Sequence, residues 1–241
     1  MRAFPDWRAG EADVTMDRYF YGLGEPTFAE LPADETVEAD GRLNGDTVHF
    51  DIIDRFGNMV SATPSGGWLS SSPVIPALGC PLATRGQMFW LEPAHPGVIA
   101  PGKRPRTTLS PSLAFRDGKP WAVFGTPGGD QQDQWSLAVF LRVALHGMNW
   151  QEAIDAPGFH TKHNPTSFWP RRAQLGHLSI ESRWPAATLA ALERRGHKVV
   201  VGEPWSEGRL TAAAREDLPG GGRILKAAAN PRGMQGYAVG R

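Results

Sequence analysis

The sequence has a single cysteine, Cys80, among its 241 residues. A disulfide within the chain is therefore excluded, and a zinc site built from several thiolates is not expected. Cys80 stands in a Leu-Gly-Cys-Pro segment with no base beside it, which favours a small buried or loop residue over a reactive thiol. The seven histidines lack the spacing of metal ligands. We therefore expect neither a metal ion nor another cofactor.

An excess of charge and a long apolar run are also missing. Lysine plus arginine and aspartate plus glutamate number 25 each, so the formal charge is zero, whereas proteins that bind nucleic acid usually carry a basic face. No stretch of about 18 apolar residues is present, so we expect no membrane span. The first residues, 1–7, lead into no apolar run, and we expect no signal peptide and a cytoplasmic location.

The composition is that of a folded globular protein. Hydrophobic residues make up 41% and charged residues 21% of the chain, which is enough to bury a core. Residues 1–46 differ, because they are rich in Asp, Glu, Gly and Pro and have few periodic apolar positions. We predict that residues 1–46 are extended and loosely packed and that residues 47–241 form the main domain.

Three pairs of apolar runs are separated by turn-forming residues, which predicts antiparallel hairpins. In the first run, Val48, Phe50 and Ile52 alternate with more polar positions, a pattern typical of a strand with one strongly apolar face. The three hairpins are expected at residues 48–53 with 59–63, at 113–115 with 121–124, and at 210–214 with 224–228.

Helical spacing recurs in the second half of the chain. We predict helices over residues 132–146, 150–156 and 185–195, with Asp130 capping the first and Gly147 ending it. Short strands are expected at residues 178–181 and, as a buried-type strand, at 199–201. Because the predicted strands come in antiparallel pairs with helices grouped between them, the pattern favours α+β layers over a parallel βαβ array.

Thr47, at the head of the first strand, is the candidate nucleophile. A hydroxyl nucleophile needs a base, and a threonine that becomes an N-terminus carries one in its own α-amino group. Gly128 and Gly129 precede a predicted helix, and their backbone N–H groups are candidate donors to an oxyanion. Each signal alone also fits a structural threonine, an ordinary turn or a phosphate loop. Asp130 and the lack of a following lysine speak against phosphate.

The residues around these positions form several motifs in a fixed order. They are residues 47–49 (Thr-Val-His), 54–61 (Asp-Arg-Phe-Gly-Asn-Met-Val-Ser), 87–88 (Gln-Met), 101–111 (Pro-Gly-Lys-Arg-Pro-Arg-Thr-Thr-Leu-Ser-Pro), 126–129 (Thr-Pro-Gly-Gly), 156–160 (Ala-Pro-Gly-Phe-His) and 230–233 (Asn-Pro-Arg-Gly). In this order they resemble the small, catalytic chain of the γ-glutamyltranspeptidases, which are N-terminal-nucleophile hydrolases. The resemblance runs from Thr47 to the C-terminus.

The resemblance implies a four-layer αββα sandwich, incomplete in this chain, in which two antiparallel sheets face each other. It also implies that residues 1–46 are the tail of a large chain and that the enzyme itself cleaves the Asp46–Thr47 bond. The freed α-amino group, with a pKa near about 8, would serve as the base. An acyl group would pass to Thr47 and then to water or an amine, in a ping-pong reaction.

Further site residues follow from the same resemblance. Gly128 and Gly129 match the oxyanion donors, and Ser65 falls where the family has a threonine that supports the nucleophile. Gln87 keeps its family identity. Thr107 and Thr108 replace a serine pair that hydrogen-bonds the substrate carboxylate.

Two departures from the family pattern bear on the substrate. Phe89 and Trp90 replace an Asp-Asp pair, whose second member binds the α-ammonium group of the γ-glutamyl donor, and an indole N–H can only donate. Gly67 replaces an asparagine that helps to hold the donor. The substrate is therefore expected to be a small amide or γ-glutamyl-type molecule with an altered, flatter or more apolar acyl group, as in the cephalosporin-acylase-like relatives.

Three hypotheses of function follow. The first is a transpeptidase-like acyltransferase or amide hydrolase, supported by Thr47 with the glycine pair. The second is a non-catalytic remnant or subunit that needs a separate large chain or forms a homo-oligomer, supported by the lack of most of that large chain. The third is a binding module that uses Trp68, Trp90 and Trp135 as an aromatic surface.

Overall fold

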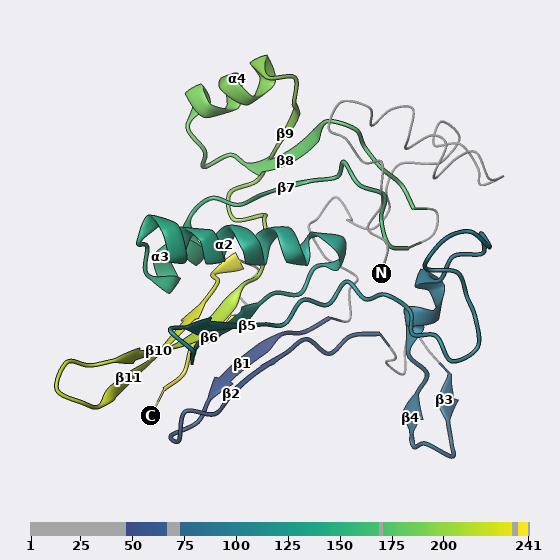
Figure 1. Ribbon diagram of the computed structural model, residues 1–241. Coiled ribbons are helices and arrows are strands. Elements are labelled where there is room, and N and C mark those ends of the chain that lie inside the picture. Colours follow the sequence, from purple (N-terminus) through teal and green to yellow (C-terminus); the bar gives the residue numbers. More distant parts are fainter. Residues whose placement is uncertain (1–46, 67–72, 169–170, 233–235, 241) are drawn as a thin grey trace.

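The computed structural model describes residues 47–66, 73–168, 171–232 and 236–240. Its centre is a helix layer, a four-stranded antiparallel sheet and a two-stranded hairpin, stacked in that order (Figure 1). The predicted extended segment 1–46, together with Gly67 and Trp68, lies outside the described residues. No helix within the described ranges is long and apolar enough to cross a bilayer.

The hairpin consists of β1 (Phe50–Ile53) and β2 (Met59–Ala62), paired antiparallel as predicted. The turn between the strands is held by the Asp54 carboxylate, which accepts hydrogen bonds from the backbone N–H groups of Phe56 and Asn58 at 2.8 and 2.9 Å. Gly57 has φ +92°, a conformation that side chains disfavour, so the turn depends on a glycine at this position.

The four-stranded sheet has the order β11-β10-β6-β5, and both predicted hairpins are present in it. Its strands are β5 (Ser112–Arg116), β6 (Lys119–Gly125), β10 (Thr211–Asp217) and β11 (Arg223–Ala229). The β5–β6 turn places Asp117 at φ 51° and Gly118 at φ 74°. Two successive residues with positive φ give the tight hairpin turn that matches strand twist.

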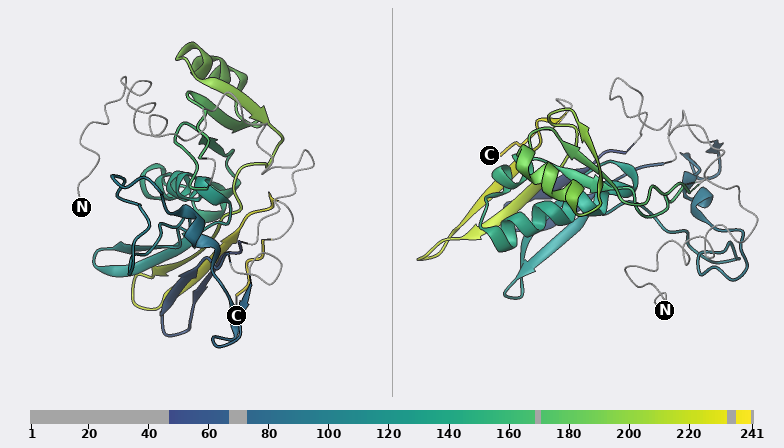
Figure 2. Two further views of the ribbon diagram at one scale, coloured as in Figure 1. Left: turned by 90° about the vertical axis from the view of Figure 1, so that its right-hand side faces the viewer. Right: turned by 90° about the horizontal axis from the view of Figure 1, so that it is seen from above.

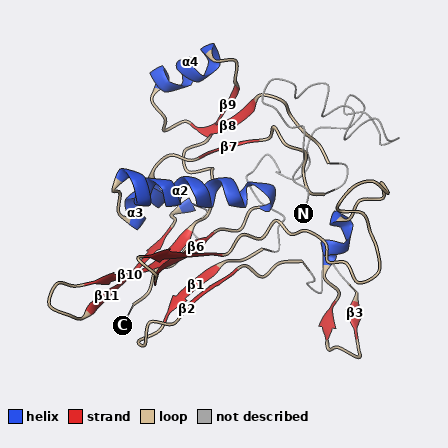
Figure 3. Cartoon of the chain, viewed as in Figure 1, coloured by secondary structure: helices blue, strands red, loops and turns tan. Residues whose placement is uncertain are grey.

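Helices α2 (Gln132–His146) and α3 (Trp150–Asp155) cover one face of this sheet (Figure 3). Gly147 ends α2 with φ 69°, and Asn149 caps α3 through a reciprocal pair of bonds with Glu152. The core fills the space between sheet and helices and includes Phe124, Val139, Trp150, Ala153, Ile154, Leu210, Ala212 and Ala214.

The prediction that Asp130 caps α2 is wrong. A short 3₁₀ turn, η4 (Gly129–Gln131), precedes the helix, and the cap position is occupied by Gln131 without a side-chain bond. The Asp130 carboxylate instead accepts hydrogen bonds from the backbone N–H and the hydroxyl of Ser167. It therefore joins the start of the helix to a distant loop.

A smaller sheet lies on the side of α2 that faces away from the four-stranded sheet, together with helix α4 (Figure 2). Its strands β7 (Phe159–Thr161), β8 (His177–Glu181) and β9 (Lys198–Gly202) are joined in the order β7-β8-β9. Helix α4 (Ala186–Arg194) connects β8 to β9, which run parallel. The expectation of antiparallel pairs alone is therefore wrong for this sheet. The expectation that strand 199–201 is buried is also wrong, since Val200 and Val201 in β9 are about half exposed.

Between the hairpin and β5, the described residues 63–66 and 73–111 form short elements. These are β3 (Val74–Ile75), β4 (Cys80–Pro81) and the 3₁₀ helix η3 (Thr84–Met88). Cys80 is a free, exposed residue in the two-residue strand β4, so it is neither the buried residue nor the loop residue that was expected.

The hairpin β1–β2 has its apolar face turned outward. Val48, Phe50 and Ile52 are 51%, 43% and 52% exposed, whereas the side chains of His49 and Asp51 face the four-stranded sheet and are almost fully buried. The alternation was predicted correctly, and the chain has the α+β class with antiparallel sheets face to face. In the part that the structure describes, helices cover one outer face of this sandwich, and the apolar face of β1–β2 is the other.

Candidate active site

Thr47 lies at the extended N-terminal end of the β1–β2 ladder, opposite Ser65. The backbone N–H of Val48 donates to the carbonyl of Pro64 at 3.1 Å, which continues the register of the two strands beyond β1. The Thr47 Oγ1 and Ser65 Oγ atoms are 2.6 Å apart, so the two hydroxyls share a hydrogen bond. The structure thus brings together two of the predicted catalytic residues.

A row of polar side chains continues from Thr47 along the inward face of the hairpin. His49 Nδ1 lies 2.7 Å from Thr63 Oγ1, and His49 Nε2 lies 3.1 Å from Asp51 Oδ2. The Thr211 hydroxyl on β10 donates to the same Asp51 oxygen at 2.7 Å. These contacts hold the strand that begins at Thr47 against the four-stranded sheet.

The glycine turn lies at the same end of the sandwich as Thr47. His49, two residues after Thr47, packs on Gly125, the last residue of β6, where a Cβ would come within 2.7 Å of the imidazole Nε2. Gly128 and Gly129 come three and four positions after Gly125 and have φ +134° and +61°. Side chains rarely adopt φ near +134°, so glycine at position 128 is a requirement of the backbone. The roles of Gly128 and Gly129 as oxyanion donors stay a prediction.

The predicted substrate-binding residues lie on separate elements. Gln87 is exposed on η3, and Thr107 is exposed in the loop before β5, where its hydroxyl accepts a hydrogen bond from the Leu109 backbone N–H at 3.1 Å. Thr108, beside it, is partly buried. Their contacts with a substrate stay a prediction.

Trp90 is buried and has planar groups stacked on it. The His95 ring lies 4.0 Å from the Trp90 ring with 19° between the planes, and the Arg171 guanidinium carbon is 4.0 Å from the ring centre. Burial and then the charges of Arg171 and Lys103 lower the pKa of His95, while Glu92 opposes them. The position where the family has an aspartate is thus surrounded by an aromatic and cationic stack.

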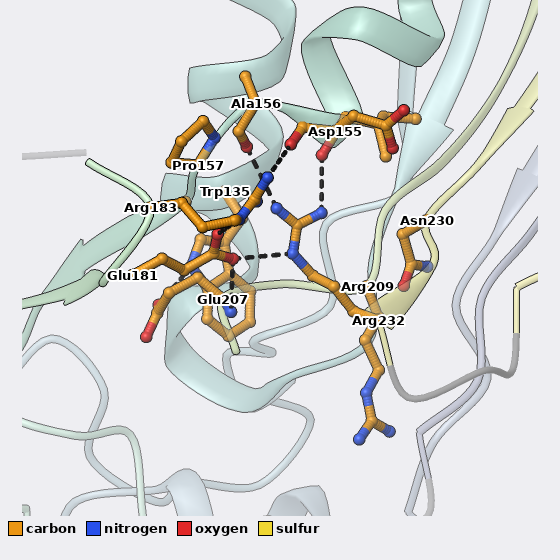
Figure 4. A network of polar contacts seen from close by, with 12 residues as sticks. Trp135, Asp155, Ala156, Pro157, Glu181, Arg183, Glu207, Arg209, Asn230 and Arg232 are labelled. Carbon is orange, nitrogen blue, oxygen red and sulfur yellow. Dashed lines mark hydrogen bonds and ion pairs between the residues drawn. The ribbon is translucent and has the colours of Figure 1, made fainter. Parts of the chain in front are cut away.

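A buried ionic network centred on Glu181 joins β8 to the C-terminal segment, and it was not predicted from the sequence (Figure 4). The Glu181 carboxylate, which has no exposed surface, accepts hydrogen bonds from Arg232 and Arg183. Arg232 Nη1 and Nη2 also donate to the carbonyls of Ile154 and Ala156 at 2.7 and 3.1 Å. In the sequence the available signal was a charged residue, Glu181, at the end of the predicted strand 178–181, and it is a weak one.

A second buried group lies next to this network. The Trp135 indole N–H and His160 Nδ1 both donate to Glu207 Oε2, and the backbone N–H of Glu207 donates to Glu181 Oε1 at 3.1 Å. Sequence reasoning placed Trp135 in a helix but assigned it only to a hypothetical aromatic surface. Among the described residues, no group of three or more His, Cys, Asp or Glu side chains is arranged to hold a metal ion.

Comparison with known proteins agrees with this arrangement. The family model of gamma-glutamyltranspeptidase matches residues 26–240. The oxamate amidohydrolase proenzyme of Klebsiella pneumoniae is 35% identical over 202 residues, which cover 83% of this chain and 36% of the relative. The glutathione hydrolase-like YwrD proenzyme of Bacillus subtilis is 32% identical over 238 residues, or 95% of this chain and 42% of the relative.

A solved structure is more similar still. A structure of LmbA2991 superposes on 85% of this chain with a TM-score of 0.75 and 59% sequence identity, and the match covers 36% of that protein. The chain therefore spans well under half the length of the relatives that it matches. Because the family model covers most of the sequence, the chain belongs to the γ-glutamyltranspeptidase family.

Proposed function

We propose that this chain carries the nucleophile of an amide hydrolase or acyltransferase, with Thr47 as the attacking residue. The single observation that carries the proposal is the 2.6 Å contact between the Thr47 and Ser65 hydroxyls at the head of a strand. A hydroxyl that is hydrogen-bonded to a second hydroxyl has a fixed orientation, as a nucleophile requires. Relatives named as an amidohydrolase and a glutathione hydrolase-like protein support amide chemistry.

The Asp46–Thr47 bond is first hydrolysed by one water molecule, which leaves a carboxylate on Asp46 and frees the α-amino group of Thr47. That amine takes the proton of the Thr47 hydroxyl while Oγ1 attacks the carbonyl carbon of an amide substrate. The carbon–nitrogen bond then breaks, and the leaving amine takes the proton. Water or a second amine attacks the resulting ester and releases the acyl group, which restores the Thr47 hydroxyl. Both relatives are named as proenzymes, which supports the initial cleavage.

The backbone N–H groups of Gly128 and Gly129 stabilise the oxyanion in this proposal. They follow β6 at the end of the sandwich that also holds Thr47, since His49 packs directly on Gly125. Loss of one oxyanion donor typically lowers kcat by about 10²- to 10³-fold. The two glycines therefore account for a large share of the expected rate.

We assign the substrate to amides whose acyl group does not rely on an α-ammonium contact. Trp90 has no acceptor for an ammonium group, and the Arg171 guanidinium on its ring carries the same charge as that group. One named relative, oxamate amidohydrolase, supports a small acyl group of this kind. A large chain, whether joined to this one before cleavage or separate, completes the pocket.

The test is an intact-mass measurement followed by trapping of the acyl group. The chain is expressed with a large chain, and three forms are compared: the natural sequence, Thr47→Ser and Thr47→Ala. We expect a new N-terminus at position 47 in the first two and an acyl adduct on the fragment that begins there. Thr47→Ala should show neither. Cleavage at the same bond in Thr47→Ala, or amide hydrolysis that persists in it, would refute the proposal and favour a non-catalytic subunit.

A further inference from the structure

The side chain of Trp135 packs against the glycine turn from the first turn of α2. Gly128 has no side chain, and an added Cβ would collide with Trp135 Cζ3 and lie 3.3 and 3.4 Å from Cη2 and Cε3. We propose that Trp135 is a positioning residue, which fixes the Gly128 backbone so that the turn presents its N–H groups to the oxyanion. This inference rests on the proposed function, because it assumes that the turn is the oxyanion site.

Trp135 is itself held by polar and aromatic contacts on its other edge. Its indole N–H donates to Glu207 Oε2 at 3.1 Å, and His160 donates to the same oxygen through Nδ1. The His160 ring also meets the indole edge-on, with 5.5 Å between centroids and 88° between planes. A bond to a charged acceptor is stronger than one between neutral groups, so the indole has one preferred orientation.

The loop that carries Glu207 also packs on the indole. An added Cβ at Gly208, whose φ is +77°, would lie 3.2 Å from Trp135 Cγ and Cδ2. The indole is thus in close contact with two glycines, with Gly128 at its six-membered ring and Gly208 at Cγ and Cδ2. Both positions are without a side chain where a side chain would displace the ring, which is the pattern expected of a ring that sets the spacing between two loops.

The position of Glu207 is fixed from the buried ionic network (Figure 4). Its backbone N–H donates to Glu181 Oε1, and Arg232 donates to the same oxygen at 2.9 Å. Glu181 and Arg232 are both almost fully buried. A continuous set of contacts therefore runs from the ionic network through Glu207 and Trp135 to Gly128.

The two ends of the glycine turn have their own anchors. Thr126 Oγ1 accepts a hydrogen bond from the Arg209 backbone N–H at 3.0 Å, and the Asp130 carboxylate accepts two from Ser167. Between these anchors, Trp135 supplies the three atoms nearest to an added Cβ at Gly128. A displacement of about 1 Å in a catalytic group can cost about 10²-fold in rate, so loss of this contact should be visible in kcat.

The first experiment tests the contact without any substrate. In the full chain labelled with isotopic glycine and combined with an unlabelled large chain, the α-hydrogens of Gly128 should carry a ring-current shift from the indole. Trp135→Ala and Trp135→Phe should change that shift, the former more. Trp121→Phe is the matched control, because it makes the same Trp-to-Phe change at the start of β6, where the indole packs on Phe140 and Trp150. An unchanged Gly128 signal in Trp135→Ala would overturn the proposal.

The second experiment measures kcat and KM on an amide substrate with the large chain present. Contacts that act only in the transition state change kcat and leave KM nearly constant. We expect kcat to fall about 10-fold in Trp135→Phe and about 100-fold in Trp135→Ala, with KM within about threefold. Glu207→Gln, which keeps an acceptor for the indole, should retain more activity than Glu207→Ala. Trp121→Phe should keep its kcat.

The outcomes separate the two proposals. Activity that survives Thr47→Ala would refute the proposed function and leave the Gly128 signal as the only test of packing. Activity that depends on Thr47 but falls equally in Trp135→Phe and Trp121→Phe, in step with their thermal stability, would refute the positioning role. A rise in KM at constant kcat in Trp135→Ala would also refute it, because the residue would then act in substrate binding.

Discussion

The hydroxyl oxygens of Thr47 and Ser65 lie 2.6 Å apart across the first two strands. This pairing follows from the ladder register, because Phe50 opposes Ala62 and each step back along one strand is a step forward along the other. Strand pairing in the hairpin therefore brings the Ser65 hydroxyl to the Thr47 hydroxyl. The same hydrogen bond extends the hairpin and orients the hydroxyl of the candidate nucleophile.

We predict that Ser65→Ala slows acylation of Thr47 about 2- to 10-fold. A neutral hydrogen bond contributes about 0.5–1.5 kcal/mol, and its loss frees the Thr47 hydroxyl to rotate. Ser65→Thr keeps the hydroxyl and should retain the natural rate. Acylation is followed by mass spectrometry with the large chain present. Equal rates in Ser65→Ala and the natural chain would show that the pair is structural alone.

We predict poor γ-glutamyl transfer, because Trp90 stands where the family has an ammonium-binding aspartate. Loss of one buried charge-assisted contact costs about 2–5 kcal/mol, which lowers the specificity constant by orders of magnitude. The measurement is turnover of γ-glutamyl-p-nitroanilide beside that of oxamate, again with a large chain. Turnover as fast as that of an ordinary transpeptidase would contradict this interpretation of Trp90.

The fold was largely predictable where local sequence determines it. The hairpin turns at Gly57 and Gly118 have positive φ, and glycine at such positions marks them in the sequence. Gly147 marks the end of α2 in the same way. The cap of α2 was not predictable, because the partner of Asp130 is Ser167, on a loop 37 positions away.

The site was predictable only in part. Motifs pointed to Thr47 and the glycine pair, and the strand register places Ser65 opposite Thr47. Alternation of apolar residues identified the first strand but could not say which face is inward, since that depends on what covers the strand. The contact of Trp135 with Gly128 was not predictable, because it joins a helix to a turn. The spacing of apolar residues alone indicates only that Trp135 is an ordinary core residue.

We predict that Glu181 makes the fold sensitive to acid. Burial alone would raise the pKa of Glu181, but Arg232, the backbone N–H of Glu207 and Arg183 together hold the pKa below its ordinary value. A carboxyl with a lowered pKa stabilises the fold above its unfolded pKa, about 4.3, and this contribution is lost as the pH falls through the folded value. Urea unfolding measured from neutral pH down to about pH 2 should therefore show a fall in the free energy of unfolding that begins near pH 4.3, deepens below it and is absent in Glu181→Gln.

The matched variants at this network are Arg232→Met and Lys226→Met. Arg232→Met leaves the Glu181 carboxylate buried with one partner fewer, and we expect a loss of about 3 kcal/mol in the free energy of unfolding. Lys226 pairs with Glu216, and both side chains are about half exposed. Lys226→Met should therefore change the free energy of unfolding by less than about 1 kcal/mol. Equal losses in the two variants would contradict a special role for the buried pair.

The last prediction concerns the outward face of β1–β2. Val48, Phe50 and Ile52 form a row on one face of a strand, and all three are about half exposed. A contiguous apolar face on a sheet surface promotes association, because its burial removes apolar area from water. In an αββα sandwich a helix layer covers the outer face of each sheet, and we propose that a large chain supplies that layer here.

We therefore predict that the chain alone dimerises or aggregates at micromolar concentration and that a large chain suppresses this. Replacement of Val48, Phe50 and Ile52 together by threonine keeps residues that favour strands but removes the apolar face, and should shift light scattering towards monomer. Leu91→Thr is the control, since Leu91 is a highly exposed apolar residue outside the hairpin. A stable, monodisperse monomer with cooperative unfolding in the natural chain would contradict the prediction. It would mean that the exposed face needs no partner, because the core between the four-stranded sheet and α2–α3 is sufficient for stability.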